Sequence, residues 1–453
     1  MIKRIELRNF RSFGSIVIDF TGKKGAMLDH AFIYGENGSG KTNIIESVAF
    51  LCASVRTFEN AGRPAIDPEY VDADGMLDIM RGMMEARDTP LSMIRRIDTA
   101  ALRETMIGAD DGMGVTYVLD IDGRDAEYMM EFGPDGRIVH EKLSYTLTDR
   151  IGRYFEVTAR YSEDGEIRVT GADAKVGRDL IRDPAYRREI LRMIAMHWGR
   201  HTLLSILAAE YSSKNAEYME SAVRPEMARI IGSIRGMAVY SPDPAVRIPP
   251  EGGFDFAQGS IPAEEEPSLD LYAGAARRYT IRLYSNVMGV FYDREVRGGV
   301  CRYRLMIQKK MHGEVRDIPI DCESSGIRKM IAMLPYFLAC AEGRAVLFDE
   351  IDCEVHEKMI GDFIAGFLRG THGQIVATTH YASLLKGIPP SNAFVIRMDM
   401  QGYKDVSCFS SIARTGKNHN NADRYLNGVF DGIPFQRTVD VPQIAEAFRE
   451  GMV

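Results

Sequence analysis

One short segment near the start of the chain combines glycines, a lysine and a hydroxyl side chain at a defined spacing. It reads GENGSGKT over residues 35–42 and matches the pattern GxxxxGK followed by Ser or Thr. Glycines let backbone N–H groups surround phosphate oxygens, and the N-terminus of a following helix adds positive potential. Lys41 is expected to reach the β- and γ-phosphates of a nucleotide, and the Thr42 hydroxyl to bind Mg2+. The expected contacts to the nucleotide come from Gly35, Glu36, Asn37, Gly38, Ser39, Gly40, Lys41, Thr42 and Asn43.

A pair of acids lies far along the chain. The run AVLFDE at 345–350 joins four apolar residues directly to two carboxylates. Asp349 is expected to hold magnesium, directly or through water, and Glu350 to act as general base on an attacking water. The alternative is an exposed strand end with solvated acids. A phosphate loop elsewhere in the chain favours the hydrolytic interpretation.

Two further segments carry weaker signals for phosphate binding. His380 ends QIVATTH, and at the carboxyl end of a strand it could hydrogen-bond a γ-phosphate, because open α/β sheets bind ligands at that edge. A capping role is the alternative. ESSGIRKM at 323–330 begins a helix, where Ser324 and Gly326 would make an anion site, although any helix cap looks similar.

The surrounding pattern supplies the elements that must position these groups. A short apolar strand at 31–34 precedes the glycine loop, and a helix is expected over 41–54. Alternating runs within 2–20 predict a strand pair, and the runs between 115 and 170, separated by Asp-Gly turns, predict antiparallel strands. Apolar residues at helical spacing follow over 176–240.

Composition excludes several classes of protein. The 453 residues are 45% hydrophobic and 26% charged, which excludes a disordered chain, a collagen-like chain and a small disulfide scaffold. A net charge of -8 gives no support for nucleic-acid binding. The six cysteines form no CxxC pair and predict reduced thiols in a cytoplasmic protein. The longest apolar run, 330–340, is too short to cross a membrane, so no membrane association is expected.

Together these motifs resemble an ABC-type ATPase head, in the order Walker A, signature, Walker B, D-loop and switch histidine. Ser324 and Gly326 match the serine and second glycine of the LSGGQ signature, and Asp352 in IDCEVH matches the D-loop aspartate. The resemblance implies that all three contribute to nucleotide binding. The long insertion before the signature looks like the RecF and SMC branch. The opening NFRSFG also resembles that branch, which implies that Arg11 lies near the nucleotide. No glutamine is identified as the Q-loop residue.

A narrower resemblance is to RloA-like, abortive-infection ATP-binding proteins. It depends on segments at both ends of the chain. The sequence departs from the family's pattern at Ile327, which replaces a threonine of the signature, and at Asp431, which shifts the match to the family's terminal motif. The matching segments are NFRSF, YGENGSGKTNIIESVAFL, HEKLSYTL, ESSGIRKMIAMLPYFL, DEIDCEVH, ATTHYASLL and RYLNGVFDGIPF.

The resemblance implies an α/β fold of the P-loop NTPase class: a two-lobed ABC-type ATPase head with an antiparallel β subdomain and a mostly helical insertion. The N-terminal lobe with Walker A is expected at 1–55 and 115–170, interrupted by an insertion of unclear structure at 56–114. A mostly helical insertion is expected at 171–300, with a Pro-rich surface loop at 241–268. The C-terminal lobe with signature, Walker B and switch histidine is expected at 301–415, followed by a tail at 416–453.

The function implied is ATP hydrolysis with Mg2+ by a head that forms a homodimer, or a higher homo-oligomer, around ATP. The first hypothesis is a sensor or regulator in antiviral defence that acts with a separate effector, a nuclease or toxin. The second is a RecF- or SMC-like protein of DNA repair or chromosome maintenance. The third is a nucleotide-gated scaffold with little turnover, against which Glu350 argues.

Overall fold

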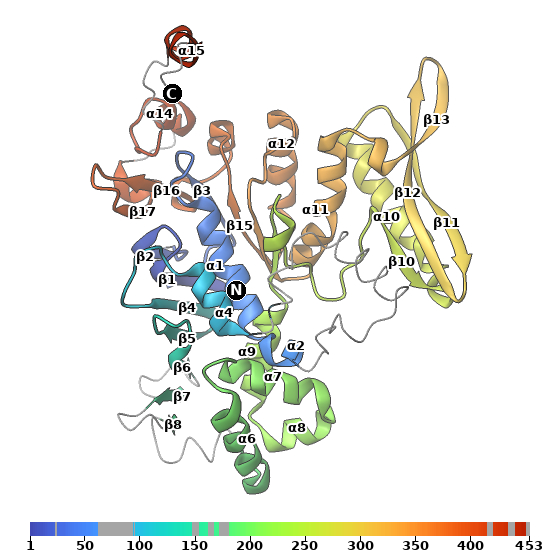
Figure 1. Cartoon of the computed structure of the whole chain (residues 1–453). Coiled ribbons are helices and arrows are strands. Elements are labelled where there is room, and N and C mark those ends of the chain that lie inside the picture. Colours follow the sequence, from blue (N-terminus) through green and yellow to red (C-terminus); the bar gives the residue numbers. More distant parts are fainter. Residues whose placement is uncertain are drawn as a thin grey trace.

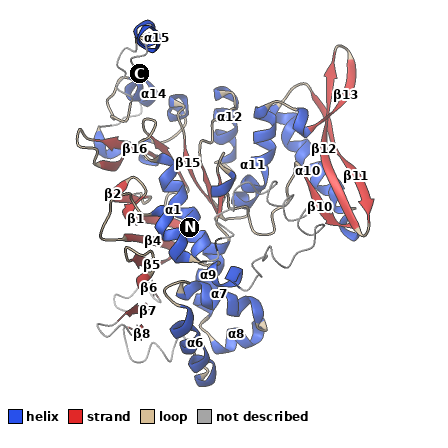
Figure 2. Ribbon diagram, in the orientation of Figure 1, coloured by secondary structure: helices blue, strands red, loops and turns tan. Residues whose placement is uncertain are grey.

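The computed structural model describes residues 1–22, 25–61, 94, 96–146, 154–161, 167–171, 181–414, 420–433 and 440–449. These residues form three sheets and a group of helices (Figure 1). Figure 2 shows the first sheet and the central sheet close together, with the third sheet far to one side. Among the helices that are described, none is both long and apolar enough to span a bilayer. All six cysteines are free.

The first sheet is antiparallel and confirms the strands expected near the N-terminus and over 115–170. Its order is β2-β1-β4-β5-β6-β7-β8. Buried and more exposed side chains alternate along β1, β4, β5 and β6, and the ring of Phe50 on helix α1 (Lys41–Ser54) contacts Phe10 and Phe132 of this sheet. The strands are β1 (Ile2–Phe10), β2 (Phe13–Asp19), β4 (Met113–Ile121), β5 (Arg124–Phe132), β6 (Ile138–Thr146), β7 (Tyr154–Tyr161) and β8 (Ile167–Gly171).

The central sheet joins the two ends of the sequence. Its order is β17-β16-β3-β15-β14-β9, and all its strands run parallel except β17. The carboxyl ends of five strands therefore meet at one edge, where ligands bind in such sheets. The strands are β3 (His30–Tyr34), β9 (Ala238–Tyr240), β14 (Ala345–Phe348), β15 (Gln374–Thr378), β16 (Ala393–Met398) and β17 (Lys404–Cys408).

Helices cover both faces of the central sheet. Helix α1 lies between this sheet and the first one, so it is buried along almost its whole length. On the opposite face lie α11 (Ser325–Ala341) and α12 (Glu357–Phe367). There the ring of Phe337 packs on Phe348, 4.8 Å away, and on Phe363, 4.7 Å away. The hydrophobic core thus fixes the sheet edge relative to α1 and α11.

The third sheet extends to one side of the molecule, with α10 against it (Figure 1). It consists of β10 (Gln258–Pro262), β11 (Val287–Arg297), β12 (Val300–Met311) and β13 (Glu314–Pro319), and α10 spans Ser268–Leu283. The remaining α-helices are α2 (Thr57–Ala61), α4 (Ile97–Glu104), α6 (Pro184–His197), α7 (Leu203–Ser213), α8 (Ala216–Ala222), α9 (Pro225–Arg235), α13 (Phe409–Ile412), α14 (Asn421–Leu426) and α15 (Val441–Arg449).

The structure corrects the expected division of the chain at three places. The sequence predicts that the strand before the phosphate loop belongs to the N-terminal lobe, yet β3 pairs with β15 and β16, which come from the region expected to form the C-terminal lobe. The expected helical insertion contains β9, which pairs with β14 in the central sheet and has only three residues, too few for a periodic signal. Strands β10 and β11 also lie in regions expected to be loop or helix. Most of the insertion expected at 56–114 lies outside the described residues.

Candidate nucleotide-binding and hydrolysis site

The glycine loop joins the carboxyl end of β3 to the start of α1, as expected. Gly38 and Gly40 have φ angles of 81° and 107°, in the left-handed region that favours glycine. A side chain at Gly40 would come within 2.7 Å of the Phe13 ring, and one at Gly35 within 2.8 Å of Ser39 Oγ. Gly35 and Gly40 therefore need glycine for both backbone conformation and space, and Gly38 for backbone conformation alone.

The side chain of Lys41 turns back toward the start of the glycine loop. Its Nζ donates hydrogen bonds to the carbonyl oxygens of Gly35, at 2.8 Å, and Glu36, at 3.0 Å. Burial lowers the pKa of Lys41, while Asp349 and Glu350 act in the opposite direction. A lysine in this position can exchange carbonyl contacts for phosphate oxygens without leaving the loop.

Thr42 and Asp349 are brought together by the central sheet. Thr42 Oγ1 lies 3.3 Å from Asp349 Oδ1, and Thr378 Oγ1 donates to the same carboxylate oxygen at 2.7 Å. Burial raises the pKa of Asp349, and the hydrogen bonds from Thr378 and Thr42 act in the opposite direction. A hydroxyl and a carboxylate oxygen fit Mg2+, which binds through few protein oxygens and keeps several waters.

Glu350 follows in a turn of unusual backbone geometry. Its φ is 48°, and its backbone N–H donates to Thr378 Oγ1 at 2.7 Å. The side chain lines a cavity of about 560 Å3, large enough for a small ligand. The residues that line this cavity are Ser12, Asn37, Gly38, Gly40, Lys41, Thr42, Asn43, Asp349, Glu350 and His380.

His380 lies on the wall of the same cavity, as expected, two residues after β15 ends. Partial burial and then Lys41 lower the pKa of His380, which leaves the ring neutral at neutral pH. A neutral ring can donate one hydrogen bond to a phosphate oxygen, which suits the expected role.

Asp352, expected at the nucleotide, is instead turned toward the interior. It is 2% exposed, and it is not among the residues that line the cavity. Its Oδ2 accepts hydrogen bonds from Thr379 Oγ1 at 2.7 Å, from the His380 backbone N–H at 2.8 Å and from the Tyr381 backbone N–H at 2.9 Å. Within one chain, therefore, Asp352 orients the loop that carries His380.

Arg11 is also engaged by protein groups rather than directed into the cavity. Its guanidinium lies 3.2 Å from Glu104 Oε1 and 3.3 Å from Glu46 Oε1. Burial raises the pKa of Glu46 to about 7, although Arg11 acts in the opposite direction. The neighbouring Ser12 lines the cavity in its place.

Ser324 and Gly326 lie outside this cavity. Ser324 is exposed and precedes the first turn of α11, with no side-chain cap of its own. The preceding Glu323 is buried and held by Lys309 Nζ at 2.6 Å. Gly326 approaches the Glu354 carbonyl so closely that a side chain there would come within 2.8 Å of it. Within a single chain, the signature segment does not complete the site.

Three residues at the site are not indicated by the sequence: Ser12 on the cavity wall, Thr378 and Lys404. Thr378 is a threonine in a β-branched run and gave no separate signal. Lys404, on β17, donates to Ser12 Oγ at 2.7 Å and to the Gly38 carbonyl at 3.1 Å. It supplies a second cation beside the phosphate loop, from a strand that follows the loop by more than 350 residues. A lysine in a polar hairpin carries no local pattern that could have revealed this contact.

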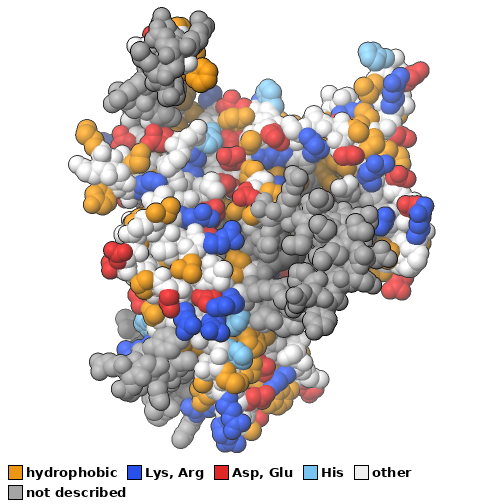
Figure 3. Space-filling model, viewed as in Figure 1, with side chains coloured by type: hydrophobic (Ala, Val, Ile, Leu, Met, Phe, Trp, Pro, Cys, Tyr) orange, Lys and Arg blue, Asp and Glu red, His pale blue; other side chains and the backbone are white. Residues whose placement is uncertain are grey.

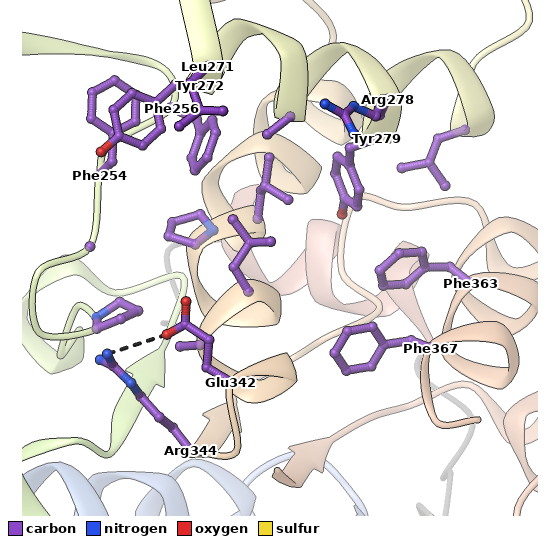
Figure 4. A pocket seen from close by; sticks show the side chains of 18 of the residues that line it. Phe254, Phe256, Leu271, Tyr272, Arg278, Tyr279, Glu342, Arg344, Phe363 and Phe367 are labelled. Atoms are coloured by element: carbon purple, nitrogen blue, oxygen red, sulfur yellow. Dashed lines mark ion pairs between the residues drawn. The ribbon is translucent and has the colours of Figure 1, made fainter. Parts of the chain in front are cut away.

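A larger hollow of about 1100 Å3 lies between α10, α11 and α12 and shares no lining residue with the nucleotide cavity. Figure 4 shows its aromatic lining, including Phe254, Tyr272 and Phe363, and the ion pair of Glu342 with Arg344. No residue of the phosphate loop at 35–42 lines it. The chemistry expected from the sequence is therefore at the smaller cavity. On the face shown in Figure 3, basic and acidic side chains of the described residues are interspersed.

Comparisons with known proteins agree with the site at the N-terminal end. Residues 4–68 match the model of an AAA domain. The DNA replication and repair protein RecF of Acetivibrio thermocellus is 45% identical over 74 residues, which cover 16% of this chain and 17% of that protein. RecF of Lachnoclostridium phytofermentans is 34% identical over 61 residues, covering 14% and 15%. Each match spans less than a fifth of the curated relative.

The solved structures that match this chain include SMC heads. An SMC head bound to the C-winged helix domain of ScpA matches with a TM-score of 0.42 and 16% identity, over 90% of this chain and 97% of that one. The SMC head domain from Thermotoga maritima matches with a TM-score of 0.33 and 13% identity, over 90% and 98%.

Proposed function

We propose that the chain is an ABC-type P-loop ATPase head of the RecF and SMC branch, and that it binds and hydrolyses ATP with Mg2+. The observation that supports this most directly is the 3.3 Å approach of Thr42 Oγ1 to Asp349 Oδ1 on the wall of a cavity that Lys41 and Glu350 also line. The glycine loop, the Thr42–Asp349 oxygen pair and Glu350 lie at one edge of the central sheet, which supports their proposed roles in binding phosphate, binding Mg2+ and activating water.

Each side chain has a distinct part in the proposed reaction. Lys41 and the loop N–H groups bind the β- and γ-phosphates. Thr42 and Asp349 would hold Mg2+, which offsets phosphate charge when bound. Glu350 takes the proton of the attacking water as the bond to the γ-phosphorus forms and the bond to the β–γ bridging oxygen breaks. The neutral ring of His380 donates a hydrogen bond to a γ-phosphate oxygen.

The proposed active form is a dimer closed around ATP. Ser324 and Gly326 lie at the exposed start of α11, outside the cavity of their own chain. In the proposed dimer they face the γ-phosphate bound by the phosphate loop of the second copy. The helix N-terminus then adds positive potential to a site that one chain leaves open.

One candidate for the cellular role is DNA repair or chromosome maintenance. The similarity of the first part of the chain to RecF supports it. The net charge of -8 gives it no added support, because DNA-binding proteins commonly carry basic surfaces.

The other candidate is a cytoplasmic sensor or regulator in antiviral defence, acting with a separate nuclease or toxin. Its support is the resemblance of motifs at both ends of the chain to RloA-like proteins, including RYLNGVFDGIPF. In the structure the described part of that segment lies beside the phosphate loop. A side chain at Gly432 would come within 3.5 Å of the Cα atom of Gly35. A pull-down from the native cell during phage challenge distinguishes the two roles by whether an effector or a repair protein is recovered.

ATP binding and turnover by the purified chain test the proposal. We expect ATP with Mg2+ to bind, to be hydrolysed and to shift the protein toward dimer in sizing chromatography. Lys41→Ala removes the phosphate-binding cation and should weaken ATP binding at least about tenfold. Lys358→Ala, an exposed lysine paired with Asp362 on α12, is the matched control. Wild-type protein that neither binds nor hydrolyses ATP would overturn the proposal.

A further inference from the structure

Lys329 is a buried lysine to which the proposed reaction assigns no part. It lies on α11 and is 6% exposed. Its Nζ donates a hydrogen bond of 2.5 Å to the backbone carbonyl of Glu350. Burying a cation is costly unless its contacts compensate, and an apolar side chain would suit the interior better. Packing alone therefore does not explain why a lysine occupies this position.

The Glu350 backbone needs support from outside its own turn. A glutamate at φ 48° is in the left-handed region, which side chains other than glycine occupy at a cost in free energy. Thr378 Oγ1 holds its N–H, and Lys329 holds its carbonyl. With the peptide groups on both sides fixed by different elements, the direction in which the carboxylate leaves the chain is fixed as well.

The same helix also contacts the other end of this turn. Gly326 lies against the Glu354 carbonyl, and Glu354 has a φ of 62°. Between the two contacts lies Asp352, whose carboxylate binds the backbone N–H of His380. The start of α11 is thus joined by direct contacts to the turn that carries Glu350 and, through Asp352, to the loop that carries His380.

The titratable groups around Lys329 belong to the same turn. Burial lowers its pKa, while Cys353, Asp352, Glu350 and Glu354 act in the opposite direction. The ammonium donates a hydrogen bond to the Glu350 carbonyl rather than to one of these carboxylates. The carboxylate of Glu350 therefore stays available to the cavity that it lines.

We propose that Lys329 is a positioning residue for Glu350: it holds the strained Glu350 backbone and links the signature helix to the hydrolytic edge of the same chain. The inference rests on the proposed ATPase function. Lys329 does not touch nucleotide. It acts through the carbonyl of the general base, so its removal affects hydrolysis while leaving the phosphate loop in place.

The test compares Lys329→Met, which keeps length and removes the charge and the donor, with Lys329→Arg, which keeps both. We expect Lys329→Met to bind ATP within about twofold of wild type and to lower kcat about tenfold or more, because a displaced base loses its alignment. Lys329→Arg should restore most of that loss. Lys358→Met is the surface control.

Hydrogen exchange supplies a readout that does not depend on turnover. In Lys329→Met, the amides at 350–354 and at His380 and Tyr381 should exchange faster, while those of residues 35–42 are unchanged. A general loss of folding would instead raise exchange throughout and weaken ATP binding together with kcat. Unchanged kcat and unchanged exchange at 350–354 in Lys329→Met would overturn the inference. Failure of the wild-type protein to bind or hydrolyse ATP would overturn the proposed function instead.

Discussion

The Thr42 hydroxyl lies 3.3 Å from Oδ1 of Asp349, although the two residues are 307 positions apart in the sequence. The central sheet produces this contact, because β15 lies between β3 and β14 and contributes Thr378 to the same carboxylate oxygen. Parallel strands place their carboxyl ends on one edge, so a loop after β3 and an acid after β14 meet there. The pair is suited to one magnesium ion.

Glu350→Gln should bind ATP but hydrolyse it about 100-fold more slowly or worse. The substitution removes the base and leaves the Thr42–Asp349 pair in place. Trapped ATP should then keep the proposed dimer closed. Phosphate release measures the rate, and sizing chromatography with ATP measures the dimer. An unchanged turnover rate would show that Glu350 is not the base.

Ser324→Arg should leave ATP binding by the monomer nearly intact and block both ATP-induced dimerisation and hydrolysis. Ser324 is exposed and lies outside the cavity of its own chain, so a larger side chain there clashes only with a second copy. Equilibrium binding and sizing chromatography separate the two effects. A variant that still dimerises and turns over normally would reduce the segment to an ordinary helix cap.

Mixing Ser324→Arg with Lys41→Ala sharpens this test. A heterodimer of the two places both substitutions in one composite site and leaves the other composite site whole. If one whole site can turn over, some activity should return on mixing, and neither variant alone should show it. Each variant on its own, at the same total protein concentration, is the control.

Lys404→Met should weaken ATP binding about 10- to 100-fold, the usual contribution of a hydrogen bond to a charged group. Its Nζ contacts two residues that line the nucleotide cavity, Ser12 and Gly38, so phosphate oxygens lie within its reach. Isothermal calorimetry gives the affinity. Arg397→Met alters the same hairpin, where Arg397 pairs with Asp405, and it should bind ATP normally. Equal affinities for the two variants would remove Lys404 from the site.

Glu46→Gln should change how stability depends on pH. Burial raises the pKa of Glu46 from 4.5 to about 7, so the folded protein binds this proton more tightly than the unfolded chain does. The contribution of Glu46 to the free energy of unfolding therefore falls as pH rises from about 4.5 to about 7. Urea denaturation should show the Gln variant gaining stability relative to wild type across that window. A difference that does not vary with pH would contradict the assignment, and Glu357→Gln at an exposed position is the control.

The sequence by itself determined where the glycine loop lies and which of its residues line the cavity. Strand, glycine loop and helix are contiguous, so a local pattern is enough to predict Lys41 and Thr42 as cavity residues. The acids after β14 and the histidine after β15 were predicted for the same reason, since each ends an apolar run. The antiparallel strands over 115–170 were confirmed where the structure describes them, because alternation is also a local signal.

Only the tertiary structure decided which groups those residues meet. Apolar patterning shows that a strand is buried but does not give its neighbours, so neither Thr378 beside Asp349 nor β9 in the central sheet followed from it. The ion pairs of Arg11 are likewise long-range contacts in the fold, as are the bonds of Lys404 to the glycine loop. The contact of Lys329 with Glu350 also follows only from the tertiary structure, because the packing of α11 on the central sheet brings a buried ammonium to the backbone of the turn after β14.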